Sequence, residues 1–261
     1  MSTVNTGVRG RGQPTGPGGD GHAGDTLEDW RARTNVFLQP IAAPSILGLF
    51  GFAAATFVVS AWMVGWYGGA ATPALMFEFA AALGGIAQGI AAIWSYHARD
   101  GIATAVHGIW AAFWLAFGLM WLLVTVGDLP VPPAHAAIVP FGYWMYAMGA
   151  LTLFSFVASL GENLAVASVL LPLAAGALLV AIYYSGVDTT SWTLKVGGYL
   201  LMVSSFTAAY TGTALMMASS WGRTVLPLGT INRFSHRNLP GRVPVQPIEY
   251  EMGEPGVKQG Q

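Results

Sequence analysis

The chain has 261 residues, of which 54% are hydrophobic and only 9% are charged, and its formal net charge is −1. Soluble domains carry roughly 25% charged residues, so this composition indicates an integral membrane protein and excludes a basic nucleic-acid-binding surface. There is no cysteine, which excludes disulfides, thiolate catalysis and cysteine metal ligands.

The first 38 residues are unlike the rest of the chain. Up to residue 33 they are mainly Gly, Pro, Thr and Asp with scattered Arg. Such a composition cannot bury enough apolar surface to form a core. The sequence therefore predicts a disordered tail over residues 1–38, in which only the segment Leu27–Leu38 has the apolar spacing of a short interfacial helix.

Six apolar runs follow this tail, and each is long enough to cross a hydrocarbon core about 30 Å thick. They lie at residues 43–66, 74–96, 102–127, 138–160, 164–185 and 193–219. The breaks between them contain Gly, Pro and charged residues, as loops do. The sequence predicts an all-α integral membrane protein with a six-helix transmembrane domain over residues 39–222, arranged as three successive hairpins, and a C-terminal tail over residues 223–261.

The basic residues predict the orientation of the spans. Nine of the eleven Lys and Arg residues lie in the two tails, and such residues are enriched on the cytoplasmic side. An even number of spans places both tails on one side. We therefore expect a multi-pass protein of the cell (cytoplasmic) membrane with both termini cytoplasmic. Arg99, in the second loop, agrees with this orientation, whereas Lys195 is the single exception.

Polar side chains within the spans are too few for catalysis. The His and carboxylate candidates there are Glu78 and His107, whereas a metal site needs several such ligands. No nucleophile–base pair or phosphate-binding loop is present. The sequence predicts no enzyme activity, no metal and no cofactor. Glu78, close to the start of its span, is expected to be a carboxylate at the rim in contact with water.

Two other polar residues each have two interpretations. Gln88 lies in the motif GGIAQG (84–89) and could contact a permeant or make an interhelical hydrogen bond. His107 shares one helix face with Trp110 and Trp114. Its imidazole could relay protons, or it could be a neutral side chain bonded to a neighbouring helix.

The first span begins with Pro44-Ser45, and Gly48 and Gly51 follow within it. Small residues at this spacing fit a pore wall as well as a plain packing helix. The middle of the spans contains no Lys or Arg. The positive electrostatic potential that an anion needs must therefore come from helix N-termini such as the one at Pro44-Ser45. The permeant is then either a small anion held by backbone dipoles or a molecule that crosses neutral.

Four motifs carry a resemblance to a known family: GLFGF (48–52), GGIAQG (84–89), AAFW (111–114) and WGRTVLPLG (221–229). Over residues 43–230 the chain resembles the acetate uptake transporter family, the YaaH/SatP-like acetate–succinate transporters. The resemblance implies a six-helix protomer assembled into a homohexameric ring, and membrane lipid and the small carboxylate are the other expected partners. Each protomer would carry its own pathway for acetate, related small monocarboxylates or succinate, and uptake would be associated with protons.

The family signature at the first span reads Asn-Pro-Ala-Pro-Leu-Gly-Leu. Pro44, Leu47, Gly48 and Leu49 match it, whereas the Asn and the second Pro are absent. Residues of this segment and the two polar candidates form the candidate substrate-binding set: Pro44, Ser45, Leu47, Gly48, Gln88 and His107.

The resemblance also implies a hydrophobic constriction, which the family builds from a Phe, a Tyr and a Leu. The corresponding residues are Phe52, Trp110 and Leu173, so that Trp110 replaces the Tyr and removes its hydroxyl. Ser95 stands where the family often has a carboxylate near the end of the second span.

These features together predict a membrane transporter or channel for acetate or a similar small carboxylate. A carboxyl group with a pKa near 4 is ionised at pH 7, so an apolar constriction favours its protonated form or requires proton and anion to travel together, as in proton symport. A channel for a small neutral solute such as ammonia or urea is the alternative. A third possibility is a membrane assembly protein that transports nothing.

Overall fold

The computed structural model describes residues 41–69, 71–130, 138–188 and 190–229. The predicted N-terminal tail, with its possible interfacial helix, and the chain beyond residue 229 lie outside these described residues.

Six helical stretches of the described chain are long and apolar enough to cross a membrane. The second stretch is continuous but is made of three pieces, α3, η1 and α4. The helices are α2 (Pro44–Met63), α3 (Thr72–Phe79), η1 (Ala80–Ala87), α4 (Gln88–His97), α5 (Gly101–Val126), α6 (Val139–Ser159), α7 (Leu164–Tyr184) and α8 (Trp192–Trp221). No strand occurs among the described residues. The predicted all-α architecture with six spans is confirmed.

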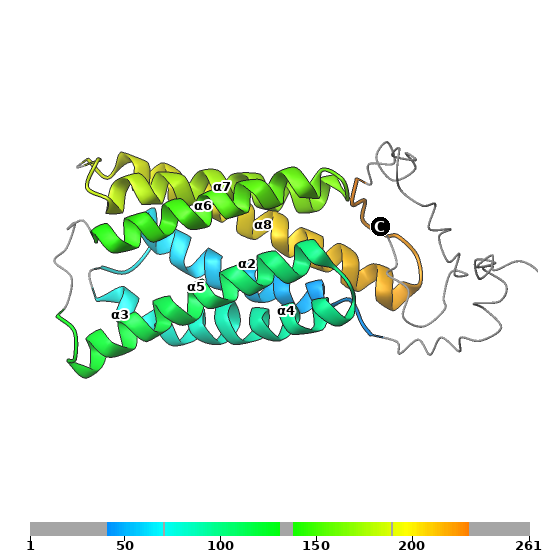
Figure 1. The fold of residues 1–261 in the computed structure, drawn as a ribbon, viewed down its shortest axis with the longest axis horizontal. Coiled ribbons are helices and arrows are strands. Elements are labelled where there is room, and N and C mark those ends of the chain that lie inside the picture. Colours follow the sequence, from blue (N-terminus) through cyan, green and yellow to red (C-terminus); the bar gives the residue numbers. More distant parts are fainter. Residues whose placement is uncertain (1–40, 70, 131–137, 189, 230–261) are drawn as a thin grey trace, which may run out of the picture. The chain divides into compact units, whose positions relative to one another are not determined.

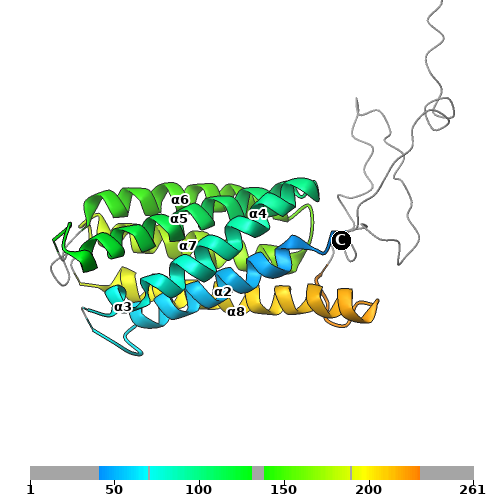
Figure 2. The same ribbon diagram turned by 90° about the horizontal axis from the view of Figure 1, so that it is seen from below.

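The helices pack in chain order around a shared apolar core. Each span contacts the next one along the chain, and α8 returns to pack against α2. Figure 1 shows α6 and α7 along one edge and α3 and α4 along the opposite edge, with α2, α5 and α8 between them. The view from below places α2 beside α8 (Figure 2). Residues from α2, α5, α6, α7 and α8 therefore meet in one buried hydrophobic cluster.

Local capping explains where the helices begin and end. Asp100 accepts a hydrogen bond from the Ala103 amide at the start of α5, and Asn163 accepts one from the Val166 amide at the start of α7. These carboxylate and amide oxygens satisfy donors that have no partner within the helix. α2 ends at Met63, before the end of the predicted apolar run, because Gly65 adopts a left-handed conformation with φ +83°.

The loop before α8 is held by one carboxylate. Asp188 Oδ1 accepts hydrogen bonds from the Thr190 hydroxyl and amide, at 2.6 and 2.8 Å, and Oδ2 accepts from the Thr193 hydroxyl and amide, at 2.7 and 2.8 Å. These bonds, first the one from the Thr190 hydroxyl and then those from Thr193, hold the pKa of Asp188 well below its usual range. A lowered folded-state pKa stabilises the fold above the unfolded-state pKa of about 3.9. This contribution is thus present at neutral pH and is lost only in strong acid, as the pH falls through the folded-state pKa.

The middle of the second span is a π-helix, η1, which the hydropathy pattern did not predict. π-helical segments are rare and are often found at functional sites. Gly84 and Gly85 lie within it, and both approach α5 closely. A Cβ atom on Gly84 would lie 2.4 Å from Cγ of Trp114, and one on Gly85 would lie 2.7 Å from Cδ2 of Leu115. At residue 84 a Cβ atom would collide with the rigid indole ring, whereas at residue 85 the end of the Leu115 side chain would have to move.

The segment after α8 folds back onto the start of α7. The Leu164 and Ala165 amides donate hydrogen bonds of 2.9 and 3.0 Å to the Gly229 and Leu228 carbonyls. The Tyr210 hydroxyl donates to the Pro227 carbonyl at 2.8 Å. Residues 223–229, the first part of the predicted C-terminal tail, thus supply acceptors for two of the amides that α7 leaves unpaired at its start.

Candidate functional site

The three residues of the expected constriction come from three different helices and lie in the same buried cluster. Phe52 of α2, Trp110 of α5 and Leu173 of α7 are 3%, 2% and 1% exposed. The rings of Phe52 and Trp110 meet edge to face, with centroids 6.1 Å apart, a favoured arrangement for aromatic pairs. We refer to Phe52, Trp110 and Leu173 as the apolar layer.

The indole N–H of Trp110 is already bonded inside the protein. It donates to the Thr152 hydroxyl at 3.1 Å, and that hydroxyl donates to the Met148 carbonyl at 2.7 Å. Trp110 is therefore tied to α6 and turns its ring, rather than its N–H, toward Phe52. Sequence reasoning missed Thr152. A lone Thr within a span was the available signal, but nothing in the sequence links residues 42 positions apart.

A buried polar pair lies one helical turn from the apolar layer. His107 Nδ1 is 3.3 Å from Gln88 Oε1, and Gln88 Nε2 donates to the Gly84 carbonyl at 2.9 Å. Because an amide oxygen only accepts, this contact places the proton of a neutral His107 on Nδ1 and leaves Nε2 as an acceptor. Both side chains therefore have the interhelical hydrogen bond that was one of the two interpretations for each of them.

Gly48 of α2 faces the His107 ring. A Cβ atom at residue 48 would lie 2.5 Å from both Cε1 and Nε2 of the imidazole. Of the candidate substrate-binding residues, the structure brings Gly48, Gln88 and His107 together, and we call these three the polar layer. Pro44 and Ser45 are half-buried at the first turn of α2, and Leu47 is exposed, so Leu47 does not reach the same place.

The remaining polar candidates lie elsewhere. Glu78 is exposed on α3. Ser95 is fully buried and donates to the Ala91 carbonyl of its own helix at 2.8 Å. No group of three or more His, Cys, Asp or Glu side chains within the described ranges could hold a metal ion.

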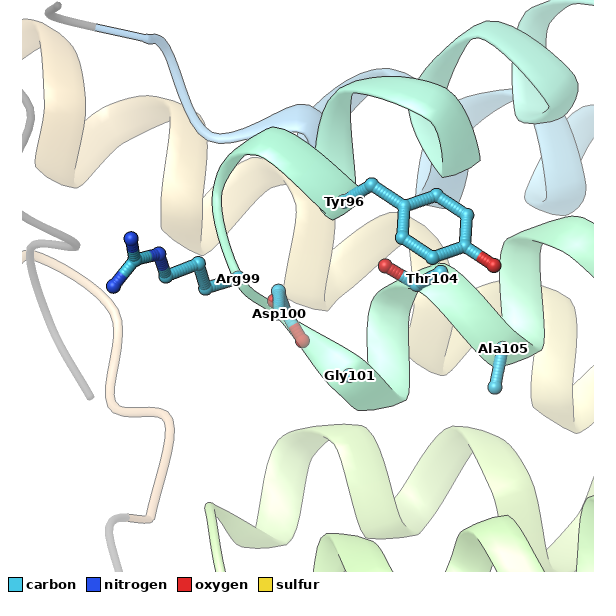
Figure 3. Close-up of a pocket in the computed structure, with 6 residues that line it drawn as sticks. All are labelled: Tyr96, Arg99, Asp100, Gly101, Thr104 and Ala105. Atoms are coloured by element: carbon cyan, nitrogen blue, oxygen red, sulfur yellow. The ribbon is translucent and has the colours of Figure 1, made fainter.

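A shallow surface pocket lies where α4 turns into α5. It is lined by Tyr96, Arg99, Asp100, Gly101, Thr104 and Ala105. Figure 3 shows the ring of Tyr96 beside Thr104, while the side chain of Arg99 points away from both. The pocket is separated along α5 from Trp110, and it contains none of the residues of the apolar or polar layer.

Comparisons with known proteins agree with this architecture. The chain is 26% identical over 189 residues to the succinate-acetate/proton symporter SatP of Escherichia coli (strain K12). The aligned region covers 72% of this chain and 96% of that protein. It is 25% identical over 205 residues to an uncharacterized protein of Methanothermobacter thermautotrophicus, covering 77% and 98%. The solved structure of the bacterial acetate channel SatP matches with a TM-score of 0.65 at 24% identity, over 72% of this chain and 99% of that one, which shows that the fold is shared.

The family profile covers most of the chain. The profile of the GPR1/FUN34/yaaH family matches residues 31–231, which include all six spans and the segment that folds back after α8. This match confirms the resemblance inferred from the four motifs. The chain belongs to the GPR1/FUN34/yaaH family.

Proposed function

We propose that this protein is a membrane transporter or channel for acetate or a related small carboxylate, succinate included, with one pathway in each protomer. The observation that carries the proposal is the apolar layer beside a buried His–Gln pair, at the centre of the six spans. Family membership and the similarity to a succinate-acetate/proton symporter support it. A transport pathway needs no catalytic group, so the proposal does not include an enzyme activity.

The apolar layer favours passage of a neutral species. Among the described residues of the six spans, Lys195 in the first turn of α8 is the only Lys or Arg. An unaccompanied carboxylate at the layer would therefore lose its hydration without meeting a cation. Passage as the protonated acid, or with a proton carried beside the anion, avoids this cost.

His107 is placed to exchange that proton. Its Nδ1 is engaged with Gln88, while Nε2 lies against Gly48, in the segment that the family signature associates with substrate. A carboxylic acid that has crossed the layer and reaches Gly48 would pass its proton to Nε2 and leave as the carboxylate. In the reverse direction, a carboxylate that enters beside Gly48 would take the proton from the protonated imidazole before it crosses the layer. The apolar layer, one helical turn away, keeps water out of this exchange.

Uptake into proteoliposomes tests the proposal. We expect labelled acetate to undergo counterflow. Its uptake should be stimulated by an inward proton gradient and reduced by unlabelled propionate or succinate. Labelled urea, measured in the same vesicles, is expected to remain outside. Urea flux without acetate flux would support the neutral-solute alternative, and the absence of both would support a protein that does not transport.

We further propose that both termini are cytoplasmic. The support is the concentration of basic residues in the two tails. Single cysteines at Ser2 and Gln261, in a chain without any other cysteine, should resist an impermeant thiol reagent in intact cells and react after permeabilisation. Labelling of either cysteine from outside would contradict this orientation.

A homohexameric ring is the assembly that we propose, on the basis of the family resemblance. The exposed large apolar side chains on the spans provide surface for lipid and for neighbouring protomers, among them Phe79 and Phe154. Light scattering of the purified protein, corrected for detergent, measures the number of protomers directly.

A further inference from the structure

A continuous chain of aromatic rings runs along the buried face of α5. Its members are Trp110, Phe113, Trp114, Phe117 and Trp121, and the ring centroids in contact lie 5.0 to 6.4 Å apart. The three indoles differ in their hydrogen bonding. Trp110 donates to Thr152, whereas the buried Nε1 atoms of Trp114 and Trp121 have no hydrogen-bond partner.

Thr56 of α2 also has a buried hydroxyl without a partner. The Thr104 hydroxyl of α5 is likewise without a partner, although a Thr or Ser in a helix can bond back to a carbonyl one turn earlier. Several hydroxyls in these spans do so, namely those of Ser95, Thr125, Thr152, Thr211 and Thr213. The Thr56 side chain has the same option and leaves it unused, so its hydroxyl is available to another group.

Thr56 and Trp114 stand at corresponding positions along their helices. Phe52 contacts Trp110 in the apolar layer; Thr56 and Trp114 each follow four residues later, about 6 Å along their helices. α2 and α5 run in the same direction (Figure 1). Both polar groups are therefore one turn beyond the apolar layer, and the polar layer of Gly48, Gln88 and His107 is one turn before it.

The indole of Trp114 packs closely against Gly84 of the π-helix. The Trp114 ring occupies the space beside Gly84, and a Cβ atom on residue 84 would collide with Cγ of Trp114. Phenylalanine would fill an apolar site without an unmade hydrogen bond, which is costly in a buried position. Glycine at residue 84 and a widened helix thus accommodate an indole whose N–H has no partner within the protein.

We propose that the Thr56 hydroxyl and the Trp114 indole N–H form a hydrogen-bonding site for the carboxyl group of the permeant, one turn beyond the apolar layer. The Trp121 N–H is the next donor along α5. An ionised carboxylate only accepts hydrogen bonds, and an indole only donates them. This donor set suits a carboxylate better than an amide or urea, whose N–H groups need acceptors. The inference rests on the proposed function and adds a contact on the far side of the layer from His107.

Two substitutions that remove the hydrogen-bonding groups test the site. Thr56→Val replaces the O–H with a methyl group of similar size, and Trp114→Phe removes the N–H but keeps an aromatic ring, although a smaller one. Loss of a hydrogen bond to a charged group corresponds to roughly tenfold in affinity, so we expect the KM for acetate in proteoliposomes to rise about tenfold in each single variant and about a hundredfold in the double variant. The matched controls are Thr125→Val, whose hydroxyl bonds to its own helix, and Trp144→Phe, an exposed tryptophan of α6. Both should keep the KM of the wild type.

A second measurement follows ligand binding to the unaltered protein and needs a variant only to assign one resonance. The indole ¹⁵N–¹H resonance of Trp114, assigned by its loss in Trp114→Phe, should move when acetate is added and stay in place with acetamide. The resonance of Trp144 should not respond to either compound. If the wild type carries acetate but the double variant keeps its KM, or the Trp114 resonance does not move, the site is wrong and the proposed function stands. If the wild type carries no acetate, the proposed function fails and this site fails with it.

Discussion

Trp110→Ala is expected to raise carboxylate flux several-fold and to blur discrimination between acetate and larger acids. The substitution removes a ring that packs against Phe52 at 6.1 Å and against Phe113 at 5.2 Å, and a methyl group cannot close the apolar layer in its place. Removing a buried aromatic side chain typically costs about 3–5 kcal/mol of stability, so the variant should also unfold at a lower temperature. Initial rates of uptake for acetate, butyrate and benzoate, normalised to the amount of folded protein, measure both effects.

Trp110→Phe separates the ring from its hydrogen bond. This control keeps an aromatic side chain opposite Phe52, and it loses the N–H donated to Thr152 together with part of the indole ring. The Thr152 hydroxyl still has the Met148 carbonyl as its partner, so selectivity should change little. If Trp110→Ala retains the selectivity of the wild type, the apolar layer is not the barrier in the pathway.

Gly48→Ala is expected to reduce acetate uptake by more than tenfold. The added Cβ would lie 2.5 Å from two atoms of the His107 ring, closer than non-bonded atoms can approach. The imidazole must then turn away, which breaks its contact with Gln88 Oε1, or the first span must move away from α5. Overpacking of this kind costs about 1–3 kcal/mol, and both adjustments disturb the polar layer. Uptake and thermal unfolding are measured on the same preparation.

A second-site change shows whether the clash with His107 is the cause. In the double variant Gly48→Ala/His107→Ala the ring is gone, so thermal stability should recover relative to Gly48→Ala, as expected for two directly interacting sites. Stimulation of uptake by a proton gradient should not recover, because the proton acceptor is missing. Gly89→Ala is the matched control, since its Cβ would make an ordinary contact at 3.8 Å with Ala111. A fully active Gly48→Ala would contradict the close approach of α2 to His107.

Properties that depend on a short stretch of chain could be read from the sequence. Whether a segment is apolar enough to span a membrane depends only on its own residues, and the six predicted runs correspond to the six helices. The four motifs were sufficient to identify the family for the same reason. The position of each helix end was less accurate, as at Met63, because turn geometry and contacts such as the hydrogen bond from the Tyr67 hydroxyl to the Val58 carbonyl are involved.

The partners of the buried polar groups could not be read from the sequence. Gln88 and His107 each had two interpretations, and their contact depends on how two neighbouring spans are rotated against each other. The π-helix around Gly84 could not be predicted from the sequence either, because α- and π-helical turns of the same residues have the same hydropathy. Only the structure shows it, together with the packing of Trp114 against Gly84.

The apolar runs alone were enough to specify six membrane helices, because burying apolar side chains in lipid is a property of each segment by itself. Contacts between helices specified everything that distinguishes the site. Thr56 and Thr152 are both threonines inside apolar spans, yet one hydroxyl has no partner and the other joins α5 to α6. The physical reason is that a hydrogen bond depends on distances of a few ångströms between side chains on different helices, which the order of residues along one helix does not contain.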